Sequence, residues 1–167
     1  MDIEYRTGDL LDAAEPAIVH GCNAQGVMGS GVALAIRKRY PAAFTAYRDE
    51  YEKSQSLALG QTIWVDCARH VVINAITQDR YGRDGQRYAD YDAIETAMRR
   101  INHVCGLTQN YTGQRSTPPK TIDAVAMPLI GAGLAGGSWA QISEIIERCS
   151  TNFQPVVYLI DGKIPRT

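Results

Sequence analysis

The chain has 167 residues, with 17 Lys and Arg against 18 Asp and Glu, so its formal net charge at pH 7 is −1. Hydrophobic residues make up 45% of the chain and charged residues 21%, which excludes the composition of a disordered chain and predicts one globular domain over residues 1–167. Non-specific binding to nucleic acid needs an excess of Lys and Arg. The balanced charge therefore argues against nucleic acid as the main partner.

The sequence predicts a cytoplasmic protein without a membrane partner. Its apolar runs are shorter than the roughly 18 residues that span a bilayer, and its start lacks the apolar stretch of a signal peptide. The cysteines are far apart and form no CxxC pair; they are Cys22, Cys67, Cys105 and Cys149. We therefore expect no metal site, no disulfide and no cofactor, and we interpret the cysteines in apolar runs as small buried hydrophobic residues.

Apolar runs that are typical of strands alternate along the chain with helical patterns. In chain order, we expect strands at 3–6 and 17–22, helices at 31–40 and 41–53, strands at 62–66 and 70–76, a helix at 90–105, a strand at 124–130, a helix that starts at Ser138, and a strand at 156–160. Segments 79–89 and 106–120 fit neither pattern and are expected to be long loops. This alternation predicts a three-layer α/β fold, in which helices cover both faces of a central sheet.

Two glycine-rich segments, at residues 23–31 and 131–137, each follow a predicted strand and precede a predicted helix. Glycine lets backbone N–H groups point into a concavity, and the N-terminus of the following helix adds positive partial charge. Because ligands of open α/β sheets lie at the carboxyl ends of the strands, the pair of loops predicts a site for a diphosphate. The alternative is that the glycines only form tight turns.

The second segment also has GxGxxG spacing at Gly131, Gly133 and Gly136, which is typical of Rossmann dinucleotide sites. That motif normally opens the first βαβ unit of its fold, with an acidic residue about 20 positions later. Here only one predicted helix and one predicted strand follow. Too little chain remains for a nicotinamide-binding half, so we do not predict a nicotinamide cofactor.

Four short motifs carry a resemblance to a known family: GDLL at 8–11, HGCN at 20–23, MGSGVA at 28–33 and PLIGAGL at 128–134. Their order and spacing resemble those of macro domains, which bind ADP-ribose. Within this family the chain looks most like the yeast-type ADP-ribose 1″-phosphate phosphatases and the related branch that includes terminal ADP-ribose–glutamate hydrolases. The resemblance implies a mixed, mostly parallel sheet of about six strands with helices on both faces, and ADP-ribose derivatives as ligands.

The resemblance also implies roles for individual residues. Asp9 and Leu10 would both bind the ligand, and Asp9 would accept a hydrogen bond from the adenine amino group. Asn23 would hydrogen-bond the distal ribose. The diphosphate would lie between two rows of residues: Gly29, Ser30, Gly31 and Val32 on one side, and Ile130, Gly131, Ala132, Gly133 and Leu134 on the other. From the residues alone, Asp9 can also be read as a turn or helix cap and Asn23 as a turn former.

The two branches differ in their catalytic residues. In the glutamate-hydrolase branch a lysine follows the fourth predicted strand and an aspartate lies in the second glycine-rich loop, where this chain has Gln78 and Ala135. Glutamine cannot supply an amine nucleophile, and alanine cannot act as an acid or base. Asp79 lies one residue further on, but it would restore a carboxylate and not an amine. We therefore do not predict that mechanism.

The phosphatase branch instead implicates a histidine within the HGCN motif, which predicts His20 as a catalytic acid or base together with Asn23. Strand alternation places His20 on the face opposite to Asn23, unless a bulge intervenes. The open alternative is a histidine that is packed inside a buried strand, with its ring nitrogens satisfied by the backbone.

The leading hypothesis is an enzyme that hydrolyses ADP-ribose 1″-phosphate to ADP-ribose and phosphate. One alternative is a hydrolase that removes ADP-ribose from modified protein or nucleic acid, which would add ADP-ribosylated macromolecules to the partners. The other is a reader that binds ADP-ribose without catalysis. The loop at 79–89 interleaves arginines with tyrosines. We interpret it as a solvated loop or as a lid whose arginines bind a terminal phosphate, rather than as an RNA-binding segment.

Overall fold

A six-stranded sheet forms the middle layer of the computed structural model, which describes residues 1–110 and 120–165. The strands are β1 (Glu4–Thr7), β2 (Ala17–Asn23), β3 (Thr62–Cys67), β4 (His70–Gln78), β5 (Ala124–Met127) and β6 (Gln154–Leu159). They lie in the order β1-β6-β5-β2-β4-β3, and only β3 runs antiparallel to its neighbour. The predicted mixed, mostly parallel sheet is confirmed, and the carboxyl ends of its parallel strands share one edge.

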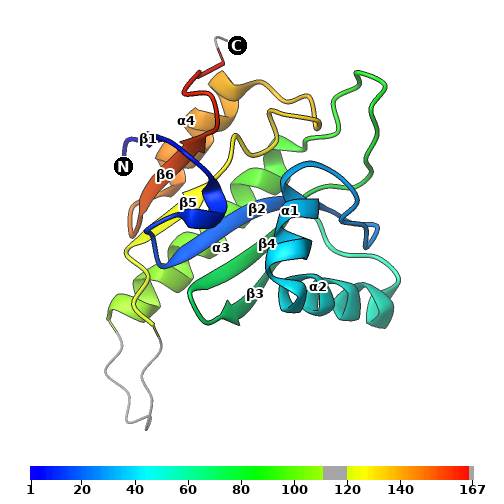
Figure 1. The fold of residues 1–167 in the computed structure, drawn as a ribbon, viewed down its shortest axis with the longest axis horizontal. Helices are drawn as coiled ribbons and strands as arrows, with labels where there is room; N and C mark the ends of the chain where they lie inside the picture. Colours follow the sequence, from blue (N-terminus) through cyan, green and yellow to red (C-terminus); the bar gives the residue numbers. More distant parts are fainter. Residues whose placement is uncertain (111–119, 166–167) are drawn as a thin grey trace, which may run out of the picture.

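Helices cover both faces of this sheet. They are α1 (Gly31–Arg39), α2 (Pro41–Ser54), α3 (Tyr91–Gln109) and α4 (Trp139–Cys149), and a short 3-10 helix, η1, spans Leu10–Asp12. In Figure 1, α1 and α2 lie in front of the sheet, whereas α3 and α4 lie behind it. The structure therefore confirms the predicted three-layer α/β fold.

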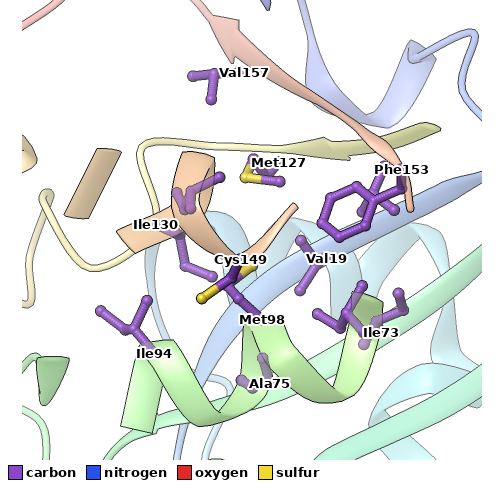
Figure 2. Close-up of a cluster of buried hydrophobic side chains, with 14 of the residues drawn as sticks. Val19, Ile73, Ala75, Ile94, Met98, Met127, Ile130, Cys149, Phe153 and Val157 are labelled. Atoms are coloured by element: carbon purple, nitrogen blue, oxygen red, sulfur yellow. The ribbon is translucent and has the colours of Figure 1, made fainter. Parts of the chain in front are cut away.

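The side chains of β2 alternate between two layers of core. Val19 packs in a cluster with Met98 of α3, while Ile18 packs on the opposite face with Ile36 of α1. Figure 2 shows the first cluster, in which Val19 and Ile73 from the sheet lie near the α3 side chains. Burying each such side chain stabilises the fold by about 1.5–3 kcal/mol. Because both faces are covered, β2 and β4 are buried along almost their whole length, as their apolar runs predict.

One predicted strand is too long. The strand expected at 124–130 ends at Met127, because Pro128 has no N–H group for the sheet. The chain turns there, with the Ile130 N–H donating to the Pro128 carbonyl oxygen at 2.7 Å. Residues 128–130 therefore lie outside the strand and lead into the second glycine-rich loop.

One predicted loop is partly wrong. The loop expected at 106–120 begins as helix, since α3 continues to Gln109. The Gln109 side-chain amide donates to the carbonyl oxygens of Ile122 and Asn152, and these tertiary contacts hold the last turn. Residues 111–119 of that loop lie outside the described residues.

Cys22, Cys105 and Cys149 are buried, as predicted, and Cys67 is half-buried. Within residues 1–110 and 120–165, no group of three His, Cys, Asp or Glu side chains is placed to hold a metal ion. None of the described helices is both long enough and apolar enough to cross a membrane.

Candidate functional site

A cleft of about 620 Å³ lies at the carboxyl ends of β2, β4 and β5. It brings together the two predicted glycine-rich loops. Of the predicted site residues, the cleft is lined by Asn23, Gly29, Ser30, Gly31, Val32, Ile130, Gly131, Gly133 and Leu134. Four other predicted site residues lie outside the lining: Asp9, Leu10, His20 and Ala132.

The first glycine-rich loop leads from β2 into α1. Gly31 has a φ of +57°, which glycine adopts without strain, and this turn lets α1 begin at the cleft. The first helical turn, from Gly31 to Ala33, lines the cleft together with Ser30. The first N–H groups of a helix lack intrahelical acceptors and carry partial positive charge. This end of α1 is therefore suited to an anion.

The second glycine-rich loop leads from β5 into α4. Gly131 has a φ of +73°, and the Gly137 N–H closes the loop by donating to the Gly131 carbonyl oxygen at 2.8 Å. The N–H groups of Gly133, Leu134 and Ala135 take no part in the backbone hydrogen bonds of the described residues. They remain available to a ligand in the cleft.

The two loops face each other across the cleft. Leu134 Cδ1 lies 3.5 Å from the place that a Cβ on Gly31 would take. Leu134 and Val32 are 54% and 37% exposed, so the rims on both sides are apolar. Among the described residues that line the cleft, Arg83 carries the one charged side chain. The arrangement is suited to an elongated anionic ligand with apolar parts.

The segment 79–89 forms one wall of the cleft, with Tyr81 and Arg83 in the lining (Figure 1, green segment at the upper right). It has no regular secondary structure, as predicted. Near its end, the N–H groups of Tyr88 and Ala89 donate to the carbonyl oxygen of Ala135, at 2.7 and 3.0 Å respectively. These bonds attach the segment to the second glycine-rich loop.

The side chain of Asn23 shapes the first glycine-rich loop. Its Oδ1 accepts hydrogen bonds from the Gln25 N–H and from the Tyr47 hydroxyl, both at 2.9 Å. Its Nδ2 donates to the Val27 carbonyl oxygen at 2.7 Å. Asn23 is 8% exposed, and one Nδ2 hydrogen is left for a ligand. Asn23 is thus a turn former, which was the alternative interpretation from the sequence, and it also lines the cleft.

Asp9 and Leu10 follow β1, at the same sheet edge as the cleft but outside its lining. Asp9 caps η1, because its Oδ1 accepts from the Leu11 N–H at 2.9 Å. The Asp9 side chain is exposed, and its Oδ2 is free of this capping bond. Leu10 is buried in the core cluster that also contains Ile36 of α1.

His20 lies inside β2 with no exposed surface and does not line the cleft. Its Nε2 lies 2.7 Å from Asn74 Oδ1. Burial lowers the pKa of the His20 imidazole to about 4, although the hydrogen bond to Asn74 opposes this shift. Burial also raises the pKa of the neighbouring Cys22 thiol, which does line the cleft. This geometry does not support the predicted role of His20 as acid or base, because the neutral ring is enclosed by the sheet and the core.

Gln78 and Ala135 both line the cleft. By the resemblance described above, the glutamate-hydrolase branch has its lysine and its aspartate at these two positions. Asp79 lies outside the lining and accepts a hydrogen bond from the Gln25 side-chain amide at 3.1 Å. Within the described part of the chain, no carboxylate and no imidazole lines the cleft. The sequence did not identify Thr77 as a cleft residue; its position directly after an apolar run was the available signal.

Comparisons with known proteins agree on one family. The model of the Macro domain family matches residues 19–146, which is more than half of the chain. An ADP-ribose 1″-phosphate phosphatase from Chaetomium globosum is 30% identical over 177 aligned positions, covering 98% of this chain and 88% of that protein.

A DNA ADP-ribosyl glycohydrolase from Mycobacterium tuberculosis is 29% identical over 85% of this chain, but the match spans only 37% of that protein. Among solved structures, the macrodomain of Mycobacterium tuberculosis DarG superposes on this chain with a TM-score of 0.73. The two chains are 26% identical, and the superposition covers 93% of this chain and 96% of the DarG macrodomain. The structural similarity therefore extends beyond the residues that the family model covers.

Proposed function

The chain belongs to the macro domain family, and on this premise we propose that its cleft binds ADP-ribose derivatives. One observation carries the proposal: backbone N–H groups without a backbone acceptor lie on both sides of one cleft. On one side they belong to the first turn of α1, and on the other side to Gly133, Leu134 and Ala135. Such groups bind a diphosphate without a row of charged side chains. The single charged side chain in the described lining, Arg83, has the sign that this ligand requires.

From the strand order we infer the direction in which the ligand lies along the sheet edge. Asp9 follows β1, the second glycine-rich loop follows β5, the first follows β2, and Gln78 ends β4. We place the adenine near Asp9, the diphosphate between the loops, and the distal ribose near Asn23 and Gln78. In this orientation Asp9 Oδ2 accepts from the adenine amino group, and Asn23 Nδ2 donates to a ribose hydroxyl.

We propose ADP-ribose 1″-phosphate as the substrate and its hydrolysis to ADP-ribose and phosphate as the reaction. The similarity to the Chaetomium phosphatase along nearly the whole chain supports this choice. A water oxygen bonds to phosphorus while the bond from phosphorus to the ribose oxygen breaks, and one proton of the water passes to the released ribose oxygen. Arg83 binds the terminal phosphate in bidentate fashion. Catalysis then depends on positioning and on electrostatic stabilisation. Asn23 orients the ribose, and His20 is a positioning residue beneath the site.

One observation favours a second candidate function, a reader that binds ADP-ribose without catalysis. No carboxylate and no imidazole is found among the described residues of the cleft lining. The similarity to the mycobacterial glycohydrolase supports a third candidate, removal of ADP-ribose from modified DNA or protein. Gln78 and Ala135 argue against a lysine-dependent form of that reaction.

Calorimetric titration with ADP-ribose tests the binding proposal. A Cβ on Gly133 meets no atom within 4 Å, so a side chain there leaves the loop intact. Gly133→Asp places a negative charge beside the diphosphate and is expected to weaken binding by about tenfold or more. Gly133→Asn has nearly the same shape without the charge and is expected to bind much better than the aspartate variant. Equal weakening by both variants, or no binding by the unaltered protein, would contradict the proposed site.

Release of inorganic phosphate from ADP-ribose 1″-phosphate separates the phosphatase from the reader. We expect release above the protein-free rate, with a strong decrease in Arg83→Gln. Arg80→Gln is the matched control, since Arg80 is exposed and lies outside the lining. Saturable binding of ADP-ribose without phosphate release would favour the reader.

A further inference from the structure

A buried hydroxyl without a partner lies in the wall of the cleft. Thr77 is 1% exposed, and its Oγ1 is the one buried side-chain nitrogen or oxygen without a hydrogen-bond partner in the described part of the chain. The buried polar side chains nearby are satisfied, since His20 and Asn74 are bonded to each other. Buried polar groups are rarely left unpaired. The exception at Thr77 points to a partner outside the chain.

The pairing of β2 with β4 explains why the sheet does not use this hydroxyl. Two successive β2 residues, Cys22 and Asn23, pair with the β4 residues on either side of Thr77, so Thr77 is the extra residue of a bulge. Its carbonyl oxygen accepts from the Asp90 N–H at 2.9 Å. The backbone is thus fixed in place without any contribution from the side-chain hydroxyl.

The hydroxyl lies against Gly21 on the neighbouring strand. A Cβ at Gly21 would be 2.7 Å from Thr77 Oγ1 and 3.3 Å from Ile130 Cγ1, and all three residues line the cleft. Glycine at this position leaves room for the hydroxyl. Because Thr77 itself lines the cleft, a molecule bound there lies beside this side chain.

The other polar side chains at this end of the cleft already bond to the protein. The Gln78 side-chain amide donates to the Arg80 carbonyl oxygen at 2.7 Å, and Asn23 Oδ1 accepts from the Gln25 N–H. Thr77 therefore contributes the hydroxyl that the protein itself leaves unpaired. A hydroxyl both donates and accepts, which matches the hydroxyls of a ribose.

We propose that the Thr77 hydroxyl hydrogen-bonds the distal ribose of bound ADP-ribose and makes the site prefer ADP-ribose over ADP. The inference rests on the proposed function, because the ligand orientation proposed above puts the distal ribose beside β4, two strands beyond β5 in the sheet order. ADP lacks this ribose and leaves the hydroxyl unpaired. ADP-ribose pairs it and gains affinity.

Parallel titrations of Thr77→Val with ADP-ribose and with ADP test the inference. Valine has nearly the shape of threonine but no hydroxyl. We expect the affinity for ADP-ribose to fall about fivefold to tenfold, with the affinity for ADP unchanged. The thermal midpoint of the unliganded variant is expected to rise, because an unpaired buried hydroxyl is removed. Thr77→Ser keeps the hydroxyl and is expected to keep the preference, and Thr96→Val, outside the lining on α3, is expected to change neither affinity.

The possible failures are distinguishable. Unchanged affinity for ADP-ribose in Thr77→Val, or equal loss for both ligands, would overturn the role of Thr77 and leave the binding proposal intact. A valine variant that does not fold would mean that the hydroxyl has a structural partner, which also overturns it. Absence of ADP-ribose binding by the unaltered protein would overturn the proposed function and this inference together.

Discussion

His20 and Asn74 form a buried pair that connects β2 with β4 beneath the cleft. Asn74 Nδ2 donates to the Ala43 carbonyl oxygen at 3.0 Å, so the pair also connects the sheet with α2. Because Asn74 Nδ2 donates to Ala43, the atom that faces His20 is Asn74 Oδ1, which can only accept a hydrogen bond. The neutral His20 ring therefore carries its hydrogen on Nε2. The pair therefore holds the strand from which the first glycine-rich loop begins.

This pair predicts an acid-sensitive fold. Burial lowers the pKa of His20 from 6.5 to about 4, so the unfolded chain takes up a proton at a higher pH than the folded chain. The contribution of His20 to stability is complete above about pH 6.5, decreases as the pH falls, and is reduced by about 3 kcal/mol at pH 4. Thermal unfolding between pH 4.5 and 7.5 checks this, with a smaller pH dependence expected in His20→Gln.

His103→Gln is the control for that measurement, since His103 is an exposed histidine on α3. This variant removes an imidazole from the surface and leaves the buried pair of His20 and Asn74 in place. A phosphate-release profile with a limb near pH 6.5 that disappears in His20→Gln would contradict the positioning role and restore the acid–base role.

Residue positions were more predictable than residue contacts. The HGCN motif at the end of an apolar run predicted Asn23 as a site residue, and Asn23 lines the cleft. The same motif could not indicate that the Asn23 amide bonds to Gln25 and Val27, since those contacts depend on the path of the turn. The bulge at Thr77 was not predictable, because it arises from the pairing of two strands that are distant in sequence.

Two loops from different parts of the chain act as one element around the cleft. The segment 79–89 is bonded to the second glycine-rich loop through the Ala135 carbonyl oxygen. A Cβ on Gly136 would lie 2.9 Å from the Gln86 carbonyl oxygen, so glycine is needed where the two loops approach. The wall that contains Arg83 therefore depends on the conformation of the second glycine-rich loop.

The closure of this loop leads to a prediction for Gly137→Ala. The added methyl group would lie 2.7 Å from the Gly131 carbonyl oxygen and 2.9 Å from Ile142 Cδ1. We expect the free energy of unfolding to decrease by about 1–3 kcal/mol and ADP-ribose binding to weaken, because the loop must open to accept the methyl group. Chemical denaturation and calorimetry measure both effects.

Gly133→Ala is the matched control in the same loop, since its methyl group meets no atom within 4 Å. It is expected to leave the free energy of unfolding nearly unchanged. If the two alanine variants were equally stable, the close contact between Gly137 and Gly131 would not contribute to holding the loop.

At the level of elements, the pattern of apolar residues located the six strands and four helices but not all their ends. The end of β5 is set by Pro128, which follows an apolar residue in an otherwise continuous run. The end of α3 is set by bonds from Gln109 to distant backbone, which no local pattern contains. The 3-10 helix η1 was not predicted, because three residues leave no period to detect.

The whole molecule builds the site at one edge of its sheet. The parallel strands β1, β6, β5, β2 and β4 present their carboxyl ends there, and the antiparallel β3 lies at the far side of the order. The alternation of strands and helices predicted the layers. It did not predict the strand order, because the order depends on which face each connecting helix packs against. The rule that ligands of open α/β sheets lie at the carboxyl ends of the strands was enough to predict that the two glycine-rich loops share one ligand, and in the structure both loops line one cleft.

The strand order also affects how the site forms during synthesis. β1, which leads to Asp9, has β6 as its single neighbour in the described sheet, with Glu4 paired to Val156. Contacts between residues so far apart in sequence are slow to form, because a long loop must first be closed. On the ribosome, β1 emerges before β6 and waits for it before it can join the sheet. The adenine end of the proposed site is therefore completed only when β6 pairs with β1, and a truncation that removes β6 leaves the strand before Asp9 without its neighbour in the described sheet.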